Sequence, residues 1–432
     1  MARIIPEMHT LGSINPHTLF VDVNRASEAE ITAARSGGGS PAGWELYEHE
    51  ARHWRDLVGT VWGRGYLDLL FATYDAVLTT PPNRMDTAYA TVLRLFDADR
   101  AILFPAYYKY VLPHAKPRGQ DERWSMGFST GVTVGSDGEL DPSRPFIFVR
   151  FDNGPIHIAR QPMSIGTLME VRAVAAEVAA TTAWLAGRPA GEEVVTWRLK
   201  EPQLAAMFYD PQLTTYSVAA HVTAFATGMT DVRGALALAD KLADISLTLT
   251  APGFATLRPT ADLGDPGFAR LRGFRRSQSR GYAFCCLAFA LREHVDRLGT
   301  GQAAIAAALK TAGLPTLDRI YADAADLMGR RPRRPALDPR LGGIRLKLLA
   351  AGRELAVRPD FDASVATLCP DGDAPAPLIC DEGCSTFSLG QAPLDLAESE
   401  FLFDCQNRYE AVLKTALRAA RGLDFGFTDY VY

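Results

Sequence analysis

The chain has 432 residues, of which 47% are hydrophobic and 22% are charged. This composition is ordinary for a globular protein with a sizeable core, and the length suggests two or three domains or one large domain with an appendage. The net charge of -5 gives no electrostatic reason to expect a nucleic acid or another polyanion as partner.

Sequence features also bear on location. The first residues, 1–7, contain no apolar stretch long enough for a signal peptide. No segment approaches the roughly 18 uninterrupted apolar residues of a membrane span. The cysteines are confined to the part of the chain after residue 280, unlike the evenly spread framework of a disulfide-rich secreted domain. We therefore expect a cytoplasmic protein that does not enter a membrane.

The first third of the chain predicts a flexible lead-in followed by a helix. Residues 24–43 are rich in Ala, Ser and Gly. Ser40 and Pro41 then suit a helix start, since serine can cap a helix and proline fits its first turn. From there apolar residues recur at helical spacing as far as Val61.

The middle of the chain predicts a β-hairpin. Residues 146–151 form an apolar, β-rich run, and residues 155–158 form a second short run. The turn sequence Asp152-Asn153-Gly154 separates them, which is typical of a hairpin.

The remaining chain predicts mainly helices, and therefore an α+β, mainly helical fold. The best boundary is the Pro- and Arg-rich stretch 329–341, which separates a region 1–330 from a smaller cysteine-containing segment 342–432. The helical patterns cover residues 165–187, 202–229, 232–247, 281–298 and 396–421.

One motif carries chemistry, His49-Glu50-Ala51-Arg52-His53, which fits H-E-x-x-H. Residues four apart on a helix share one face about 6 Å apart, so His49 and His53 can bind a single cation. Glu50 points beside that pair, where it can act as general base on a water. Asp56 is either a partner for an imidazole N–H or a solvated helix charge. The alternative is a pair of ordinary histidines on an amphipathic helix.

A catalytic zinc ion usually takes three protein ligands and leaves a position for water. Glu170 is the first candidate for the third ligand, because it places a carboxylate at the start of an apolar, Ala-rich helix. Burying an unpaired carboxylate is costly, so this one needs a partner. Glu293 is the second candidate, although the neighbouring Arg292 and His294 offer it ion pairs.

The segment 47–54, followed by the segment from Gly166 through Glu170 to Ala173, resembles the zincin metallopeptidases. More narrowly, it is similar to the gluzincin type, in which a second helix contributes a glutamate within an E-x-x-A context. The resemblance implies a zincin-like catalytic region in which His49, His53 and Glu170 bind one Zn²⁺. It also implies that Glu50 is the catalytic base and that the reaction is peptide-bond hydrolysis. The two motifs cover about a tenth of the chain.

Such a reaction also needs a donor for the oxyanion of the intermediate. His157, His221, Tyr107 and Tyr108 are candidates, and each has a structural interpretation as well. His157 is favoured because its hairpin leads directly into the helix that carries Glu170.

Other patterns are weaker. Residues 127–131 fit G-x-S-x-G, the serine nucleophile elbow, but the polar residues before them favour a simple turn. A second, structural zinc site is open as an alternative to buried free thiols, with the ligands Cys369, Cys380, Cys384 and Cys405.

The sequence therefore predicts a zinc-dependent hydrolase, a metallopeptidase acting on a peptide or protein. The alternatives are a non-catalytic interaction protein that retains a zincin scaffold and a hydrolase of non-peptide amides. An intact Glu50 favours an enzyme, because a purely structural metal site has no use for a base. Substrate identity and oligomeric state do not follow from the sequence.

Overall fold

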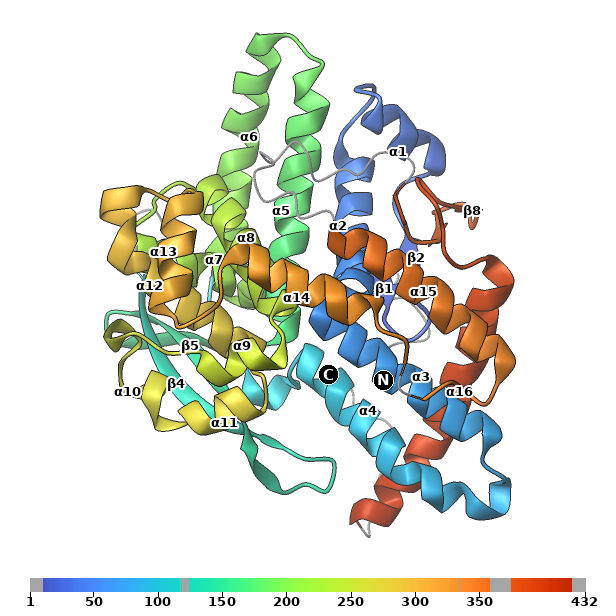
Figure 1. Ribbon diagram of the computed structural model, residues 1–432. Coiled ribbons are helices and arrows are strands. Elements are labelled where there is room, and N and C mark those ends of the chain that lie inside the picture. Colours follow the sequence, from blue (N-terminus) through green and yellow to red (C-terminus); the bar gives the residue numbers. More distant parts are fainter. Residues whose placement is uncertain (1–10, 117, 119–123, 333, 358–373, 422–432) are drawn as a thin grey trace.

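The computed structural model describes residues 11–116, 118, 124–332, 334–357 and 374–421. The chain forms an α+β, mainly helical fold, as the sequence predicts (Figure 1). None of the helices in these ranges combines the length and the apolar character needed to cross a bilayer.

Two long helices form the centre of the fold. Helix α2 (Ala42–Gly59) carries the H-E-x-x-H motif and packs along α5 (Ile165–Ala186), which carries Glu170. Helix α5 begins at Ser164, whose side chain forms a capping box with Thr167. Most of its alanines are buried against α2 and the neighbouring helices, and their small side chains let the helices approach closely.

Helices after α5 enclose its other faces. Helices α7 (Thr214–Thr227) and α8 (Val232–Thr248) both pack on α5, and α12 (Arg280–Leu298) packs on α7 and α8. Helix α6 (Ala190–Phe208) runs back beside α5, and this pair projects at the top of Figure 1.

A four-stranded antiparallel sheet feeds directly into α5. Its strand order is β3-β6-β5-β4. The predicted hairpin is confirmed, because β5 and β6 pair through a turn in which Gly154 has a φ of +56°. Residues 163 and 164 then connect β6 to α5. The strands are β3 (Tyr110–Val111), β4 (Trp124–Val134), β5 (Leu140–Asn153) and β6 (Ile156–Pro162).

A second small sheet joins the two ends of the described chain. Strand β2 pairs with β1 on one side and, in parallel, with β7 on the other. The described part of segment 342–432 therefore shares a sheet with the N-terminal region. The strands are β1 (Gly12–Asn15), β2 (Phe20–Val23), β7 (Ile379–Cys380) and β8 (Thr386–Phe387).

The C-terminal helices pack on the same N-terminal region. Helix α15 (Pro339–Val357) contacts α2 and α3 (Val61–Thr79), and α16 (Leu396–Arg421) contacts α3 and α4 (Tyr89–Ile102), at the right of Figure 1. Segment 342–432 therefore contributes to the core around α3 instead of packing only on itself. The other helices are α9 (Ala251–Thr256), α10 (Gly264–Ala269), α11 (Leu271–Arg276), α13 (Gln302–Thr311), α14 (Leu317–Gly329), and the 3-10 helices η1 (Pro82–Ala88), η2 (Ala106–Tyr108), η3 (Pro211–Leu213) and η4 (Ala261–Leu263).

Three local predictions were wrong. The expected flexible lead-in contains helix α1 (Glu28–Arg35), which Ser27 and Glu30 stabilise through a capping box. The single helix expected over 202–229 is two helices, because Pro211 starts a short 3-10 turn between α6 and α7. Residues 127–131 lie inside β4 instead of forming a turn.

Candidate metal centre

The side chains of His49, His53 and Glu170 meet where α2 crosses α5. The two Nε2 atoms lie 3.2 Å apart. Each of them also lies 3.5 Å from Oε2 of Glu170. In the described part of the chain, these residues form the group of potential metal ligands whose atoms gather at one point. The structure therefore brings together the ligand set that the sequence predicts.

The size of this triangle fits a zinc ion. Tetrahedral ligands at about 2.0–2.1 Å from zinc are separated from one another by about 3.3–3.4 Å. The observed separations of 3.2, 3.5 and 3.5 Å match one face of such a tetrahedron. Oε2 of Glu170 is moreover a buried oxygen without a hydrogen-bond partner among the described residues. A cation bound by the triangle would satisfy this oxygen and leave a fourth position for water.

The electrostatics of the cluster also favour a cation. Burial lowers the pKa of His49, but the nearby carboxylates of Glu170 and Glu177 outweigh it and raise this pKa well above 6.5. The pocket around the imidazoles thus attracts positive charge. A divalent ion provides that charge without protonating the ligands.

Glu177 was missed as a site residue, and it orients His49. Its Oε1 lies 2.5 Å from Nδ1 of His49. Nδ1–H donates to this carboxylate, so the Nε2 lone pair of His49 faces the cation position. Glu170 and Glu177 are seven residues apart, which places both on one face of α5. That spacing is the sequence signal that could have identified Glu177.

We expect Glu177→Ala to weaken zinc binding by about 10- to 100-fold, the usual effect of removing a carboxylate that orients a metal-binding histidine. Competition with a chromophoric chelator measures the affinity. Glu192→Ala is the matched control, because Glu192 is an exposed glutamate on α6 that pairs with Arg188. Equal affinity in the two variants would contradict the orienting role of Glu177.

Glu50 lies beside the triangle with its carboxylate free. It is 5% exposed, and no hydrogen bond or ion pair within the described ranges engages it. Burial raises its pKa, and the nearby imidazoles only partly offset this effect. Strand β1 approaches closely here, since a Cβ on Gly12 would lie 3.0 Å from Cγ of Glu50. A carboxylate with a raised pKa suits proton transfer near neutral pH.

Tyr216 lies near the cluster, and Lys109 lies beside the same helix, α7. Tyr216 comes from α7, and its ring centroid is 6.4 Å from that of His49. The charge of Glu170, burial, and the charge of Glu50 raise its pKa, so its hydroxyl stays protonated. Lys109 Nζ donates to Thr215 Oγ1 at 3.3 Å. Neither Tyr216 nor Lys109 was a sequence candidate, because only the fold brings their segments to α2 and α5.

A buried ion network lies next to the ligands and connects α2, α5 and α8. Arg172 is in contact with Asp56 and Asp240, each at 3.1 Å, and with Asp244 at 2.6 Å. Arg52, the second variable residue of the motif, pairs with Asp240 at 2.6 Å. The network connects the two helices that carry the candidate ligands.

The structure rejects the solvated interpretation of Asp56. This residue is 1% exposed and pairs with Arg172. No described hydrogen bond joins it to His53, whose Nδ1 is buried without a partner among the described residues. Asp56 therefore belongs to the ion network that supports the site.

Two further sequence candidates, His157 and Glu293, have no contact with the triangle among the described residues. Nδ1 of His157 lies 3.0 Å from Oδ1 of Asp152, and its ring stacks on Tyr110. No contact of the described residues joins His157 to the triangle, so its catalytic role stays a prediction without a supporting contact. Glu293 is exposed on α12, and it is Glu170 that meets the histidines.

The other oxyanion candidates have structural surroundings. Tyr107 is exposed, whereas Tyr108 belongs to an aromatic cluster with Phe104 and Phe146. Nε2 of His221 lies 2.8 Å from the carbonyl oxygen of Phe208 and donates to it. Burial lowers the pKa of His221 to about 4.

The low pKa of His221 predicts a loss of stability in acid. Between pH 6.5 and about 4 the unfolded chain binds a proton that the folded chain does not bind. The free energy of unfolding therefore falls by up to about 1.4 kcal/mol per pH unit through this window. Urea unfolding at pH 7 and pH 5 measures the difference. His221→Gln keeps a hydrogen-bond donor that does not titrate, so its free energy of unfolding should differ less between the two pH values. A difference equal to that of the wild type would contradict the role given to His221.

The predicted cysteine site is not assembled among the described residues. Cys369 lies outside them. Cys380 and Cys384 flank the turn after β7, while Cys405 is buried in α16. The described residues contain no group of three potential ligands that includes these cysteines.

Comparison of the chain with protein-family models, with curated proteins and with solved structures found no match. The arguments about function therefore rest on the geometry of the site.

Proposed function

We propose that the protein is a zinc-dependent hydrolase that cleaves an amide bond, and that its substrate is a peptide or protein. The observation that carries the proposal is the triangle of His49, His53 and Glu170, whose edges of 3.2, 3.5 and 3.5 Å suit one zinc ion. The free carboxylate of Glu50 beside it favours a catalytic site over a structural one.

Each residue has a distinct role in this proposal. His49, His53 and Glu170 would hold the ion, and Glu177 keeps the His49 ring in its binding tautomer. A zinc ion bound there supplies a Lewis acid that acidifies water and polarises a carbonyl group. Glu50 accepts the proton of the attacking water and returns it to the leaving amine.

Tyr216 is the donor best placed for the oxyanion. Its hydroxyl has no hydrogen-bond partner among the described residues, and it stays protonated beside the carboxylates of the site. A protonated hydroxyl can stabilise negative charge as the carbonyl carbon becomes tetrahedral.

Tyr216→Phe should lower kcat by about 100- to 1,000-fold, the usual effect of losing one oxyanion donor. The expected change in KM is small, because the donor acts on the transition state. Zinc content should stay unchanged. Tyr107→Phe, at an exposed tyrosine, is the control. A variant that loses zinc, or that keeps full kcat, would contradict this role.

A pool of synthetic peptides tests the substrate class. The protein is incubated with the pool after chelation, after zinc is restored, and as the Glu50→Gln variant. Cleavage that requires both zinc and Glu50 supports a peptidase. A pool that stays intact beside zinc-dependent release of ammonia or amine from small amides would favour the non-peptide alternative. An absence of both reactions in the zinc-loaded protein would favour the non-catalytic alternative.

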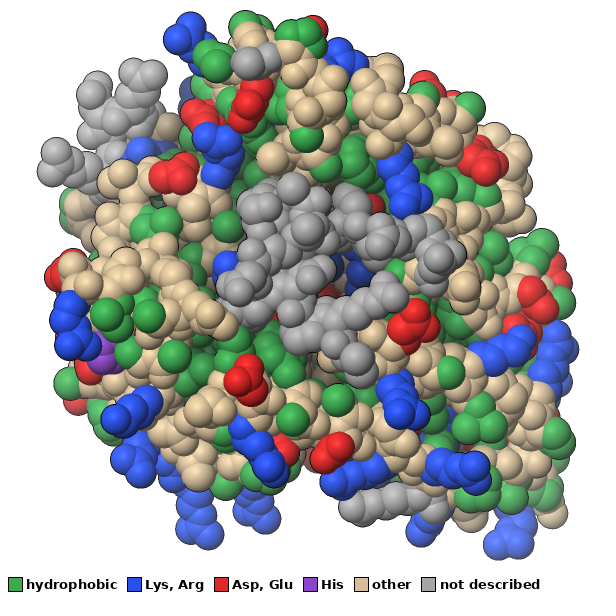
Figure 2. All heavy atoms as spheres, turned by 45° about the horizontal axis from the view of Figure 1, so that its top comes forward, with side chains coloured by type: hydrophobic (Ala, Val, Ile, Leu, Met, Phe, Trp, Pro, Cys, Tyr) green, Lys and Arg blue, Asp and Glu red, His purple; other side chains and the backbone are tan. Residues whose placement is uncertain are grey.

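The cytoplasm remains the proposed location, and nucleic acid is not proposed as a partner. Acidic and basic side chains both occur across the face in Figure 2, with several Lys and Arg residues along its lower edge.

A further inference from the structure

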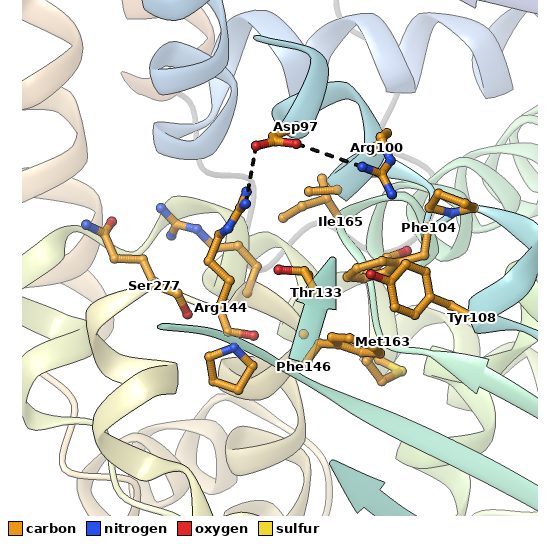
Figure 3. Close-up of a pocket in the computed structure, with 18 of the residues that line it drawn as sticks. Asp97, Arg100, Phe104, Tyr108, Thr133, Arg144, Phe146, Met163, Ile165 and Ser277 are labelled. Atoms are coloured by element: carbon orange, nitrogen blue, oxygen red, sulfur yellow. Dashed lines mark hydrogen bonds and ion pairs between the residues drawn. The ribbon is translucent and has the colours of Figure 1, made fainter. Parts of the chain in front are cut away.

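Outside the metal centre, a pocket lies between α4, β5 and the first turn of α12 (Figure 3). The charged side chains labelled there pair with one another, because Asp97 lies 3.2 Å from Arg144 and 3.9 Å from Arg100. They need no ligand of opposite charge. Reactive side chains that no covalent bond engages lie elsewhere, in the turn that connects β7 to β8.

Two free cysteines, Cys380 and Cys384, meet at this turn. The thiol of Cys380 donates a hydrogen bond to the carbonyl oxygen of Asp381, at 3.7 Å. The backbone N–H of Cys384 donates to the same oxygen, at 2.9 Å. Both cysteines therefore lie against one atom, and their thiols are within hydrogen-bonding reach of each other.

The side chain of Asp381 holds the turn in this shape. Its Oδ1 accepts hydrogen bonds from the N–H groups of Gly383, at 3.0 Å, and Ser385, at 2.8 Å. Its Oδ2 accepts from the N–H of Glu28, at 3.1 Å, which joins the turn to the start of α1 at the upper right of Figure 1. A bond between the two thiols can therefore form within a turn that already brings them together.

Cys384 has a backbone conformation that usually belongs to glycine. Its φ is +61°, in the left-handed region, where a Cβ atom is sterically unfavourable. Side chains kept in such conformations cluster at functional sites. At this position the conformation places a sulfur atom beside Cys380.

The two thiols differ in access to solvent. Cys384 is exposed, whereas Cys380 is half-buried at the end of β7. A small disulfide in solution therefore reaches Cys384 first, and the neighbouring thiol of Cys380 can complete an exchange. The other described cysteines are fully buried in α12 and α16, and they are Cys285, Cys286 and Cys405.

We propose that Cys380 and Cys384 form a reversible disulfide by exchange with a low-molecular-weight disulfide such as glutathione disulfide. The thiolate of Cys384 attacks one sulfur of glutathione disulfide, which forms a mixed disulfide and releases one glutathione. The thiolate of Cys380 then attacks Sγ of Cys384, which forms the intramolecular bond and releases the second glutathione. Two electrons pass to glutathione disulfide, and the two thiol protons end on the released glutathiones. The site does not depend on the proposed hydrolase activity.

Peptide mapping of the full-length protein tests the proposal. The protein is incubated with glutathione disulfide, and the remaining thiols are labelled with N-ethylmaleimide in urea. A glutamate-specific protease then cleaves at Glu382, between the two cysteines. We expect Cys380 and Cys384 to lose their labelling together, with a disulfide joining their two peptides. Both should be labelled again after treatment with dithiothreitol.

Three substitutions locate the bond. Cys380→Ser should stop at the mixed disulfide, with glutathione retained on Cys384. Cys384→Ser should slow the loss of labelling at Cys380 by at least about tenfold, because that thiol is half-buried. Cys369→Ser is the matched control and should form the disulfide as the wild type does. A disulfide that requires Cys369, glutathione that stays on Cys384 of the wild type, or full labelling of both thiols would each overturn the proposal.

Discussion

Replacement of Glu50 by glutamine is expected to lower kcat of the zinc-loaded protein by about 100- to 10,000-fold, the range typical of general acid–base catalysis. Glutamine has nearly the same shape but cannot accept the proton of the attacking water. Because Glu50 lies beside the triangle and is not part of it, the variant should bind zinc as tightly as the wild type. The measurements are kcat on a cleaved peptide and zinc content per chain.

Glu139→Gln is the matched control for this experiment, because Glu139 is an exposed glutamate in the turn between β4 and β5. It should retain full activity. If Glu50→Gln stays active while its zinc site is filled, Glu50 is not the base. If it loses zinc, Glu50 is a ligand and the assignment of the triangle is incomplete.

Arg172→Met is expected to lower the free energy of unfolding by about 3–5 kcal/mol, the usual loss when one partner of a buried ion pair is removed. The substitution leaves Asp56, Asp240 and Asp244 facing one another in the core. Arg52 still reaches Asp240 but lies 3.9 Å from Asp56. Urea unfolding of the metal-free protein measures the loss without a contribution from zinc.

The control for this prediction is Arg319→Met, which removes an exposed ion pair with Asp323 on α14. Surface pairs of this kind contribute about 0–1 kcal/mol. Similar losses in the two variants would show that the buried network contributes no more than a surface pair. A large loss for Arg172→Met alone would show that the network holds α2, α5 and α8 together.

Local sequence signals located the long central helices α2, α5, α8 and α12, the C-terminal helix α16 and the central hairpin. Helix α2 and helix α5 follow the predicted ranges closely, because helical periodicity marks both of them and Pro41 marks the start of α2. The β5–β6 hairpin was predictable from one turn sequence. The triangle was also predictable from local sequence. The H-E-x-x-H motif supplies two ligands, and Glu170 is a carboxylate on an apolar helix, where it needs a partner.

The rest of the site depends on long-range packing, which no local pattern encodes. Tyr216 approaches His49 only because α7 packs on α5. Asp56 was open to a surface interpretation because its partner, Arg172, lies 116 positions later in the chain. The parallel pairing of β2 with β7 joins segments far apart in the chain, and strands of this length give no periodic signal.

The most direct test of the central claim is the metal content of the purified protein, measured by elemental analysis on the wild type and on the His49→Ala, His53→Ala variant. Our account predicts about one zinc ion per chain in the wild type and none in the variant. A wild type that binds no zinc even when zinc is supplied would contradict it. Zinc that persists in the variant would contradict the assignment to the triangle and direct attention to the C-terminal cysteines.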